Sequence, residues 1–323
     1  MRYTTLGRTG LRVSVAGLGT GGYSRLGLGT GKTEANAIAV VREAHAQGIT
    51  LFDTGTNYMN EAVLGRALQP IPRDSIVITT KTPIHKADGT LTPERVIAGL
   101  DASLRDLRTD YLDVFMLHGV PPAHYQYAHD VILPTVLREK DKGKFRHLGI
   151  SETAPGDLQH EMLRRATLEG WIDVAMVSFH MMHQSARDKL FPHTMAQKVG
   201  TMLMYAVRGI FTSPDRLLTE LRAAVAAGQI PVSWYTDTNP LNFLLHPGGA
   251  ETLVDAAYRF ARHEPGVDIV LFGTGNTAHV RDNISSLLGP PLPAADHAEL
   301  IRLCASLPGL GLDRPAHATP AIR

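Results

Sequence analysis

The feature of the sequence that most constrains the fold is a regular alternation of short apolar segments with amphipathic segments. The apolar segments predict eight β-strands, at 13–18, 49–53, 75–80, 111–117, 145–150, 172–178, 201–206 and 267–272. Amphipathic segments predict a helix after each strand, at 34–47, 61–68, 92–107, 129–142, 156–168, 185–198, 249–263 and 277–288. Regular βα alternation gives a parallel sheet, and eight units over about 250 residues close it into a (β/α)8 TIM barrel.

Three segments fall outside this repeat within a single predicted domain, 1–323. Residues 1–14 contain two β-like runs around a Gly-Arg-Thr-Gly turn and predict an N-terminal β-hairpin. Residues 209–247 form a long insertion after the seventh strand, which we expect to act as a lid over the barrel mouth. Residues 290–323 form a C-terminal extension with a helix and a tail, which packs outside the barrel or reaches its mouth.

Composition excludes several classes of partner. A net charge of +1, without a stripe of Lys and Arg, argues against nucleic acid. The longest apolar runs have the length of strands, and the first residues lack the apolar core of a signal peptide, so we expect no membrane span. The single cysteine, Cys304, excludes an internal disulfide and fits the cytoplasm. The 15 histidines lack the spacing of a metal site, so we expect no metal.

Polar residues follow three successive predicted strands and suggest catalysis. Asp53 and Tyr58 follow the strand at 49–53, and Lys81 and His118 stand at the ends of the next two strands. Taken singly, such residues are often a helix cap, a packing residue or a solvated lysine, but barrel enzymes assemble their sites from the ends of different strands. An ammonium beside a phenol favours the phenolate and eases proton donation, a carboxylate orients the ammonium, and an imidazole can hydrogen-bond a carbonyl oxygen.

These motifs resemble those of the aldo-keto reductases. The resemblance extends from LGRTGLRVSVAGLGTGG to GTGNTAHVRDNISSLL and is most specific in FDTGTNY, the Lys81 strand end and DVFMLH. It implies a (β/α)8 barrel and reversible hydride transfer between a nicotinamide cofactor and an aldehyde, ketone or sugar carbonyl. It also implies that Asp53, Tyr58, Lys81 and His118 form the family's catalytic tetrad, with Tyr58 as the general acid.

The resemblance extends to the nicotinamide end of the cofactor. It implies that Gly19, Thr20 and Gly21 let the backbone approach the nicotinamide and the substrate. It implies that Ser151 binds the carboxamide and that Tyr205 stacks on the ring. The sequence departs from the family at Glu152 and Met176, where the family commonly has Asn and Gln on the same amide.

At the adenosine end, the resemblance points to the last βα unit. The residues it implies are Gly273, Thr274, Gly275, Asn276, His279 and Asn283. Backbone N–H groups at the start of a helix bind phosphate without a charged side chain. Thr274 and His279 stand where the family often has Lys or Arg on the 2′-phosphate of NADP, so we expect NADP(H) with NAD(H) as the alternative.

Two alternatives to the reductase hypothesis stay open. One is a cofactor-binding sensor or regulatory barrel with little turnover, suggested by Glu152 and Met176, and the other is a lyase in which Lys81 forms a Schiff base. We expect the substrate to be a small carbonyl compound or alcohol, with Tyr23, Trp234 and Tyr235 lining its pocket.

Overall fold

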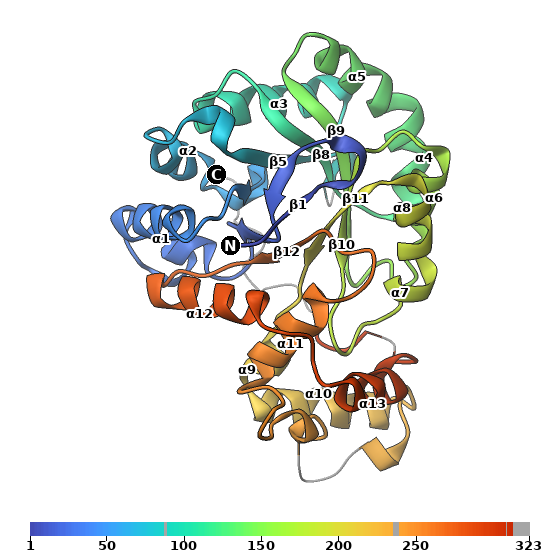
Figure 1. Ribbon diagram of the computed structural model, residues 1–323. Coiled ribbons are helices and arrows are strands. Elements are labelled where there is room, and N and C mark those ends of the chain that lie inside the picture. Colours follow the sequence, from blue (N-terminus) through green and yellow to red (C-terminus); the bar gives the residue numbers. More distant parts are fainter. Residues whose placement is uncertain (87–88, 235–238, 308, 313–323) are drawn as a thin grey trace.

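The computed structural model describes residues 1–86, 89–234, 239–307 and 309–312, and its centre is a closed barrel of eight parallel strands (Figure 1). The strands are β3 (Ala16–Gly19), β4 (Leu51–Asp53), β5 (Val77–Pro83), β8 (Leu112–Val120), β9 (Phe145–Glu152), β10 (Val174–Ser178), β11 (Gly200–Met204) and β12 (Ile269–Phe272). They neighbour one another in chain order, and β12 pairs with β3 to close the ring. The predicted barrel is therefore confirmed.

Helices surround the barrel. The longer ones are α1 (Glu34–Ala46), α2 (Glu61–Leu68), α3 (Pro93–Leu107), α5 (Leu133–Asp141), α6 (Glu161–Glu169), α8 (Phe191–Gln197), α10 (Pro214–Ala226), α11 (Leu253–Arg262), α12 (Thr277–Leu288) and α13 (Ala294–Cys304). The short ones are α4 (Tyr125–Tyr127), α7 (Ala186–Lys189), α9 (Gly209–Thr212), the π-helix η6 (Ala128–Ile132), and the 3-10 turns η1 (Gly7–Thr9), η2 (Arg25–Thr30), η3 (Thr56–Tyr58), η4 (Arg73–Ser75), η5 (Pro122–His124), η7 (Val232–Trp234) and η8 (Asn242–Leu244).

Two small antiparallel pairs complete the secondary structure. Strands β1 (Tyr3–Thr5) and β2 (Arg12–Ser14) form the predicted N-terminal hairpin. Its Leu6 and Val13 are fully buried and join the side chains inside the barrel, so the hairpin closes the end at which the barrel strands begin. The second pair, β6 (His85–Lys86) and β7 (Gly89–Thr90), was not predicted and projects from the other end of the barrel, after β5.

Side chains of the barrel strands alternate between the interior and the surrounding helices. The interior is filled by Leu51, Val77, Val114, Met116, Val174, Met176, Met202, Ile269 and Leu271. The intervening residues, such as Phe52, Ile78 and Phe115, belong to the larger apolar core under the helices. Because the side-chain period of a strand is two residues, the interior positions fix which polar residues at the strand ends point inward.

Four predicted helices differ from the structure, and the one expected at 249–263 begins at Leu253. The helix expected at 185–198 is divided into α7 and α8, because Pro192 lacks the N–H that a continuous helix would use. The helix expected at 156–168 begins only at Glu161, where Asp157 accepts hydrogen bonds from the N–H groups of Glu161 and Met162 at 2.9 Å each. The helix expected at 129–142 begins earlier, at Tyr125, and includes the π-helical turn η6.

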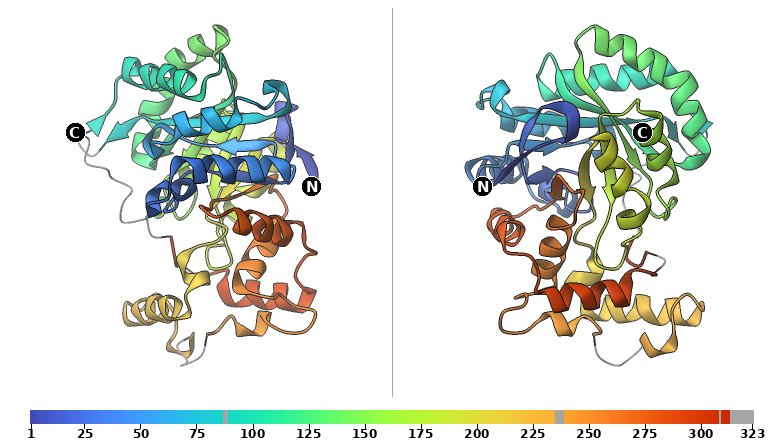
Figure 2. Two further views of the ribbon diagram at one scale, coloured as in Figure 1. Left: turned by 90° about the vertical axis from the view of Figure 1, so that its left-hand side faces the viewer. Right: turned by 45° about the vertical axis from the view of Figure 1, so that its right-hand side comes forward.

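The insertion after β11 packs beside the barrel (Figures 1 and 2). Its helices α9 and α10 form a lobe together with α11 and α13. The C-terminal extension contacts the loops that follow β10 and β11, since Leu310 N–H donates to Met182 O at 3.3 Å and Arg208 Nε donates to Gly311 O at 3.0 Å. The lid role of 209–247 stays a prediction, because residues 235–238 lie outside the described residues.

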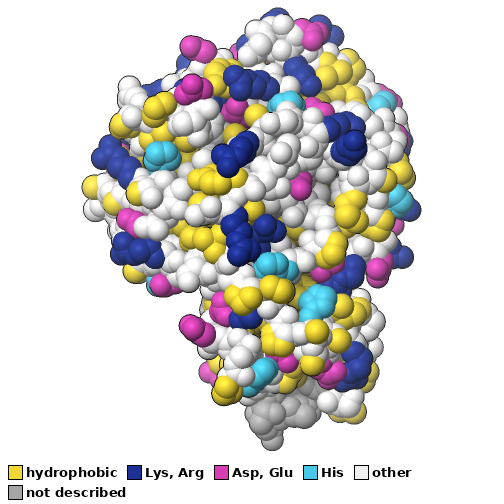
Figure 3. Space-filling view, in the orientation of Figure 1, with side chains coloured by type: hydrophobic (Ala, Val, Ile, Leu, Met, Phe, Trp, Pro, Cys, Tyr) yellow, Lys and Arg dark blue, Asp and Glu magenta, His cyan; other side chains and the backbone are white. Residues whose placement is uncertain are grey.

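The surface is mixed in charge. Figure 3 shows Lys and Arg interspersed with Asp and Glu on the face that carries the N-terminal hairpin. Among the described residues, no helix is both long and apolar enough to cross a membrane. Within the same part of the chain, no cluster of His, Cys, Asp and Glu has the geometry of a metal site.

Candidate active site

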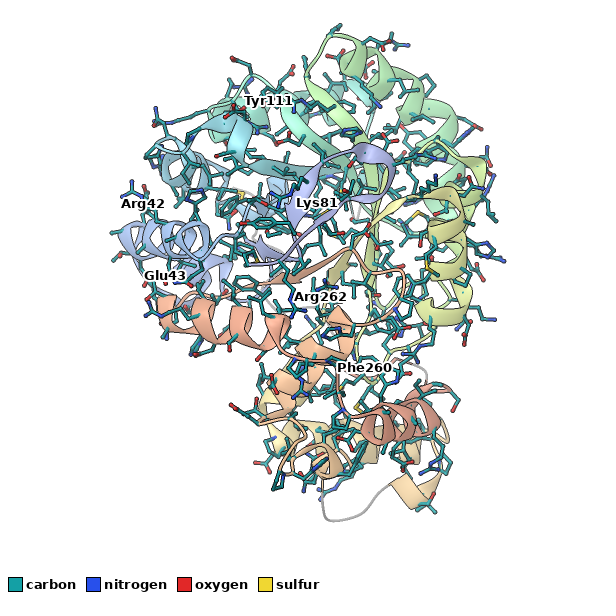
Figure 4. The ribbon with its side chains drawn as sticks, in the orientation of Figure 1. Arg42, Glu43, Lys81, Tyr111, Phe260 and Arg262 are labelled. Carbon is teal, nitrogen blue, oxygen red and sulfur yellow. The ribbon has the colours of Figure 1, made fainter. Side chains whose placement is uncertain are left out.

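Strand register brings the predicted catalytic residues to one end of the barrel interior. Asp53 lies two residues after the interior residue Leu51, and Lys81 lies four residues after Val77. His118 follows Val114 by the same four residues. All three side chains therefore belong to the inward-facing set at the ends of β4, β5 and β8, and Figure 4 labels Lys81 within the barrel.

The ammonium group of Lys81 donates hydrogen bonds to three oxygen atoms. Its Nζ donates to Asp53 Oδ1 at 2.6 Å, to Asp53 Oδ2 at 2.7 Å and to the carbonyl of Thr54 at 2.6 Å. Thr79 also donates to Asp53 Oδ1, at 2.7 Å. Lys81 is fully buried, which lowers the pKa of its ammonium, while the charge of Asp53 opposes that shift. All three donor positions of the ammonium are occupied, so its orientation is fixed.

Tyr58 lies over this ion pair. It is the last residue of η3, and its ring centroid is 5.0 Å from Lys81 Nζ and 5.6 Å from the ring of His118, which meets it edge-on at 89°. Gly21 makes room for the phenol: a Cβ atom at that position would lie 2.6 Å from Tyr58 Cζ. The four predicted tetrad residues are thus brought together, and Gly21 contacts the phenol ring directly.

Burial raises the pKa of the Tyr58 phenol well above its ordinary value, and Asp53 and Tyr205 raise it further. This differs from the expectation that Lys81 favours the phenolate. The physical reason is that Lys81 is paired to both oxygens of Asp53, so its charge is offset at the phenol while the cost of burying a phenolate remains. Tyr58 therefore stays protonated at neutral pH, as a proton donor must.

Asn60 is a site residue that the sequence analysis missed. It is buried, donates from Nδ2 to the carbonyl of Thr20 at 2.7 Å, and accepts from the hydroxyls of Thr20 at 3.2 Å and Thr54 at 3.1 Å. It ties the turn after β3 to the loop that carries Tyr58. The hydroxyl of Thr20, predicted to lie at the cofactor, is therefore engaged in this link. An Asn two residues after the tyrosine was the only signal in the sequence.

Adjacent residues of β9 face opposite sides of the barrel wall. Ser151 is buried and pairs in register with Met176, an interior residue, and its hydroxyl accepts from Gly119 N–H at 2.7 Å beside His118. Glu152 instead follows the outward set of Leu148 and Ile150. The sequence analysis expected Glu152 and Met176 at the same carboxamide of the cofactor. The structure instead places Met176 in the apolar interior of the barrel and Glu152 on the side of the wall that faces the helices.

Glu152 is part of a buried polar network behind the wall. Its Oε1 accepts from the N–H and the hydroxyl of Ser178, both at 2.6 Å. Its Oε2 lies 2.7 Å from His160 Nδ1, and His160 Nε2 lies 2.9 Å from Ser185 Oγ. Burial disfavours the charged imidazole, but the neighbouring carboxylate outweighs it and raises the pKa of His160. Both oxygens of Glu152 are thus engaged.

Tyr205 occupies a special backbone position at the end of β11. Its φ of +69° is unusual for a residue other than glycine, and strained residues of this kind concentrate at functional sites. The guanidinium of Arg208 lies 4.2 Å from the centroid of its half-buried ring. One face of Tyr205 is therefore covered by a cation, and the ring is close enough to Tyr58 to influence its pKa.

The loop from Gly273 to Asn276 leads into α12. Asn276 caps the helix, since its Oδ1 accepts from Ala278 N–H at 3.0 Å, and Thr274 Oγ1 accepts from the N–H of Asn276 at 3.1 Å. Gly275 lies directly under η2, since a Cβ atom on it would be 2.5 Å from Cα of Gly27.

Lys32 supplies a cation at this loop that the sequence analysis did not identify. Its Nζ donates to the carbonyl of Gly275 at 2.8 Å, and its side chain is exposed. His279 is exposed and Asn283 is half-buried on α12, as a cofactor role requires. Arg281 is paired with Glu43 of α1 at 3.0 Å, and Figure 4 shows Glu43 on the α12 side of α1.

The structure places the side chain of one of the three predicted substrate residues. Tyr23 is 62% exposed in the turn after β3. Trp234 ends η7, and Tyr235 lies outside the described residues. Their contribution to a substrate pocket stays a prediction.

Comparison with known proteins identifies the family. The profile described as "Aldo/keto reductase family" matches residues 17–304. The chain belongs to the aldo/keto reductase family. It is an NAD(P)(H)-dependent oxidoreductase that acts on carbonyl or CH–OH groups of small molecules, as the sequence predicts.

Two curated relatives and one solved aldo/keto reductase structure illustrate the similarity. The chain is 28% identical to L-galactose dehydrogenase of Arabidopsis thaliana, over 87% of this chain and 86% of that protein. It is 30% identical to the NADH-specific methylglyoxal reductase of Escherichia coli, over 59% of this chain and 63% of that protein. The Klebsiella pneumoniae aldo/keto reductase in complex with NADP and acetate superposes with a TM-score of 0.65 and 22% identity, over 94% of this chain and 96% of that one.

Proposed function

We propose that this aldo/keto reductase reduces a small aldehyde, ketone or sugar carbonyl, with Tyr58 as the proton donor. A bound NAD(P)H would supply the hydride to the carbonyl carbon, while Tyr58 donates its phenolic proton to the carbonyl oxygen. The products are an alcohol and NAD(P)+, and a proton from solvent restores the phenol. The observation that carries the proposal is the convergence of Tyr58, His118 and the Asp53–Lys81 pair at one end of the barrel.

Each member of the group has a separate role in this proposal. His118, edge-on to the Tyr58 ring, hydrogen-bonds the carbonyl oxygen and orients it toward the phenol. Asp53 and Lys81 form a fixed ion pair beneath the phenol and together tune its proton affinity. The raised pKa of Tyr58 keeps the phenol protonated at neutral pH, which is the form that donates a proton to the carbonyl oxygen.

The surroundings fit a nicotinamide cofactor. Ser151 is buried beside Gly119, and its hydroxyl proton is available for the carboxamide. Tyr205 offers a ring at the end of β11, and the start of α12 offers backbone N–H groups for phosphate. These residues would hold the cofactor along the strand ends from β9 to β12, beside Tyr58.

For the choice between cofactors, we propose NADP(H). The relative from Escherichia coli is named as NADH-specific and the solved Klebsiella structure contains NADP, so the family accommodates both. In this chain, the exposed ammonium of Lys32 at Gly275 provides charge beside the start of α12, where Thr274 is neutral. A 2′-phosphate carries up to two negative charges and favours a site with such a cation.

The geometry weighs against both alternatives. A Schiff base needs a lysine amine free of protons, but all three donor positions of Lys81 are engaged with oxygen atoms. A sensor with little turnover was suggested by Glu152, yet its carboxylate is engaged with Ser178 and His160. We further propose a cytoplasmic location, to which the single cysteine, buried in α13, gives support.

Replacement of Tyr58 by Phe tests the proposal. We expect kcat for carbonyl reduction to fall by ~10²–10⁴-fold, because the proton donor is lost. We expect the dissociation constant of NADPH, measured by fluorescence titration, to change little. A Tyr58→Phe variant that reduces a substrate at the parental rate would exclude Tyr58 as the acid.

A further inference from the structure

The strand that carries His118 contains a β-bulge near its end. Strands β8 and β9 are neighbours in the barrel wall (Figure 1), and the register between them shifts by one residue between Leu117 and Val120. As a result, His118 and Gly119 together lie opposite one residue of β9, Ser151. Bulges of this kind change the direction of a side chain and are common next to active sites.

The bulge affects how His118 is presented to the site. Leu117 and Val120 are both fully buried in the core under the helices. In a regular strand, residues three apart point to opposite faces, so only the extra residue lets both of these point outward. His118 lies between them and points to the inside, where its ring meets that of Tyr58. The position of the imidazole therefore depends on the backbone of the bulge.

Gly119 gives the bulge its conformation. Its φ of +60° is left-handed, which glycine adopts without strain. A bulge interrupts the regular ladder between strands, so the N–H and the carbonyl of its residues require other partners. On the other side of β8, strand β5 ends at Pro83, opposite His118. The support of Gly119 therefore comes from the side of β9.

Two hydroxyl groups at the end of β9 hold Gly119. Its N–H donates to Ser151 Oγ at 2.7 Å, and the hydroxyl of Thr153, directly after β9, donates to its carbonyl oxygen. Ser151 and Thr153 are two residues apart and face the same side, whereas Glu152 between them faces the helices. The approach of Thr153 is close, since a Cβ atom on Gly119 would lie 3.1 Å from Thr153 Oγ1. Side chains thus fix both polar groups of the Gly119 backbone.

We propose that Thr153 is a positioning residue for His118 in carbonyl reduction. Its hydroxyl fixes the carbonyl of Gly119, and the fixed bulge holds the imidazole of His118 where it orients the carbonyl of the substrate. The inference rests on the proposed function, which gives His118 that role. Ser151 binds the same glycine, so the residue proposed for the carboxamide and the residue proposed for the substrate carbonyl are joined through one backbone unit.

Removal and retention of one hydroxyl group test this role. Thr153→Val replaces the hydroxyl by a methyl group of similar size, and Thr153→Ser keeps the hydroxyl. Thr201→Val is the matched control, because the hydroxyl of Thr201 also donates to a backbone carbonyl, that of Gly266, but at the opposite end of the barrel. Thr153→Val is made both in the parent and in a His118→Ala background.

Kinetics are measured with glyceraldehyde and with butanal, with NADPH as the cofactor. We expect Thr153→Val to lower kcat and kcat/KM together by about tenfold, since a displacement of ~1 Å can cost ~10²-fold and Ser151 still holds one side of Gly119. Thr153→Ser keeps the hydrogen bond and Thr201→Val loses one far from the site, so kcat of both should stay within about twofold of the parent. In the His118→Ala background, Thr153→Val should change kcat by less than about twofold, because its effect passes through His118.

Stability separates positioning from a general structural role. Thr153→Val and Thr201→Val each lose a hydrogen bond to a backbone carbonyl, so both should lower the melting temperature by a few degrees. Only Thr153→Val should also lower kcat.

Each of three results would overturn the inference: parental kcat in Thr153→Val, an equal loss of kcat in Thr201→Val, or an undiminished effect of Thr153→Val in the His118→Ala background. Parental kcat in His118→Ala, or a parent that reduces neither aldehyde, would count against the proposed function instead. The role of Thr153 would then be judged by NMR of protein with isotope-labelled histidine, in which the imidazole signals missing from His118→Ala identify His118. A shift of these signals in Thr153→Val but not in Thr153→Ser supports positioning by the hydroxyl, and a shift in both or in neither refutes it.

Discussion

Replacement of Gly21 by alanine should disable Tyr58 without unfolding the protein. The added Cβ would lie 2.6 Å from Cζ and 2.7 Å from Cε2 of the Tyr58 ring. Carbon atoms in ordinary contact are about 3.5–4.0 Å apart, so the ring must shift by roughly 1 Å. The backbone of Gly21 does not have a positive φ, so alanine introduces no strain of its own.

A displacement of this size is expected to reduce turnover strongly. A misplacement of about 1 Å in a reacting group can lower the rate ~10²-fold, which corresponds to about 2.7 kcal/mol in the activation free energy. The substitution removes no hydrogen bond and no charge, and Tyr58 is half-buried, so the ring has space to move. We therefore expect the melting temperature to change by only a few degrees while kcat falls about 100-fold.

Gly55 provides the matched control. A Cβ atom on Gly55 would lie 3.5 Å from Cε2 of the same ring and 3.6 Å from Cε1 of His118, which are ordinary contact distances. Its φ of −176° is extended backbone that alanine adopts. Steady-state kinetics of both variants with one substrate and NADPH measure the difference. Parental turnover in Gly21→Ala, or a loss in Gly55→Ala as large as in Gly21→Ala, would refute the steric argument.

Two further predictions concern the buried network and the cofactor. Glu152→Gln should lower the free energy of unfolding by about 3 kcal/mol at pH 6 and by less at pH 9, measured by urea denaturation. The loss is larger at pH 6 because the pKa of His160 is raised in the folded protein: its ion pair with Glu152 contributes fully below pH 6.5 and is lost as the pH rises through the folded-state pKa. Equal losses of unfolding free energy at both pH values would contradict this prediction. Lys32→Met should weaken NADPH binding about tenfold or more and leave NADH binding within about twofold, while His279→Arg should strengthen NADPH selectively. If the ratio of the NADPH and NADH dissociation constants is unchanged in both variants, neither Lys32 nor His279 contacts the 2′-phosphate.

The sequence was sufficient for the barrel and for the gathering of the tetrad because both depend on local patterns. Alternation of strands and helices predicts the closed parallel sheet, and the two-residue period of strands then carries Asp53, Lys81 and His118 to the same side of the wall. Helix ends were less accurate, since the break at Pro192 and the late start at Glu161 depend on single residues and on the cap from Asp157.

Contacts between distant segments could not be predicted from these patterns. Gly21 and Tyr58 are separated by 36 residues that include a whole helix, and nothing in the sequence states that one leaves room for the other. The link from Lys32 to Gly275 joins the first and last βα units and depends on how the barrel closes. The direction of the Tyr58 pKa was also wrong, because the pairing of Lys81 with Asp53 and the depth of burial are properties of the folded chain.

The departure from the family at Glu152 illustrates how the barrel wall separates chemistry from stability. Ser151 and Glu152 are neighbours in the chain, but successive side chains of a strand point to opposite faces. Ser151 therefore remains beside Gly119 and His118, while Glu152 forms its ion pair with His160 behind the wall. A buried carboxylate without such partners would be strongly destabilising, so His160 and Ser178 are what make glutamate tolerable at this position. The change of residue type at 152 thus alters the support of β9 and β10 and leaves the groups around Tyr58 in place, which is the reason to expect an active reductase from this chain.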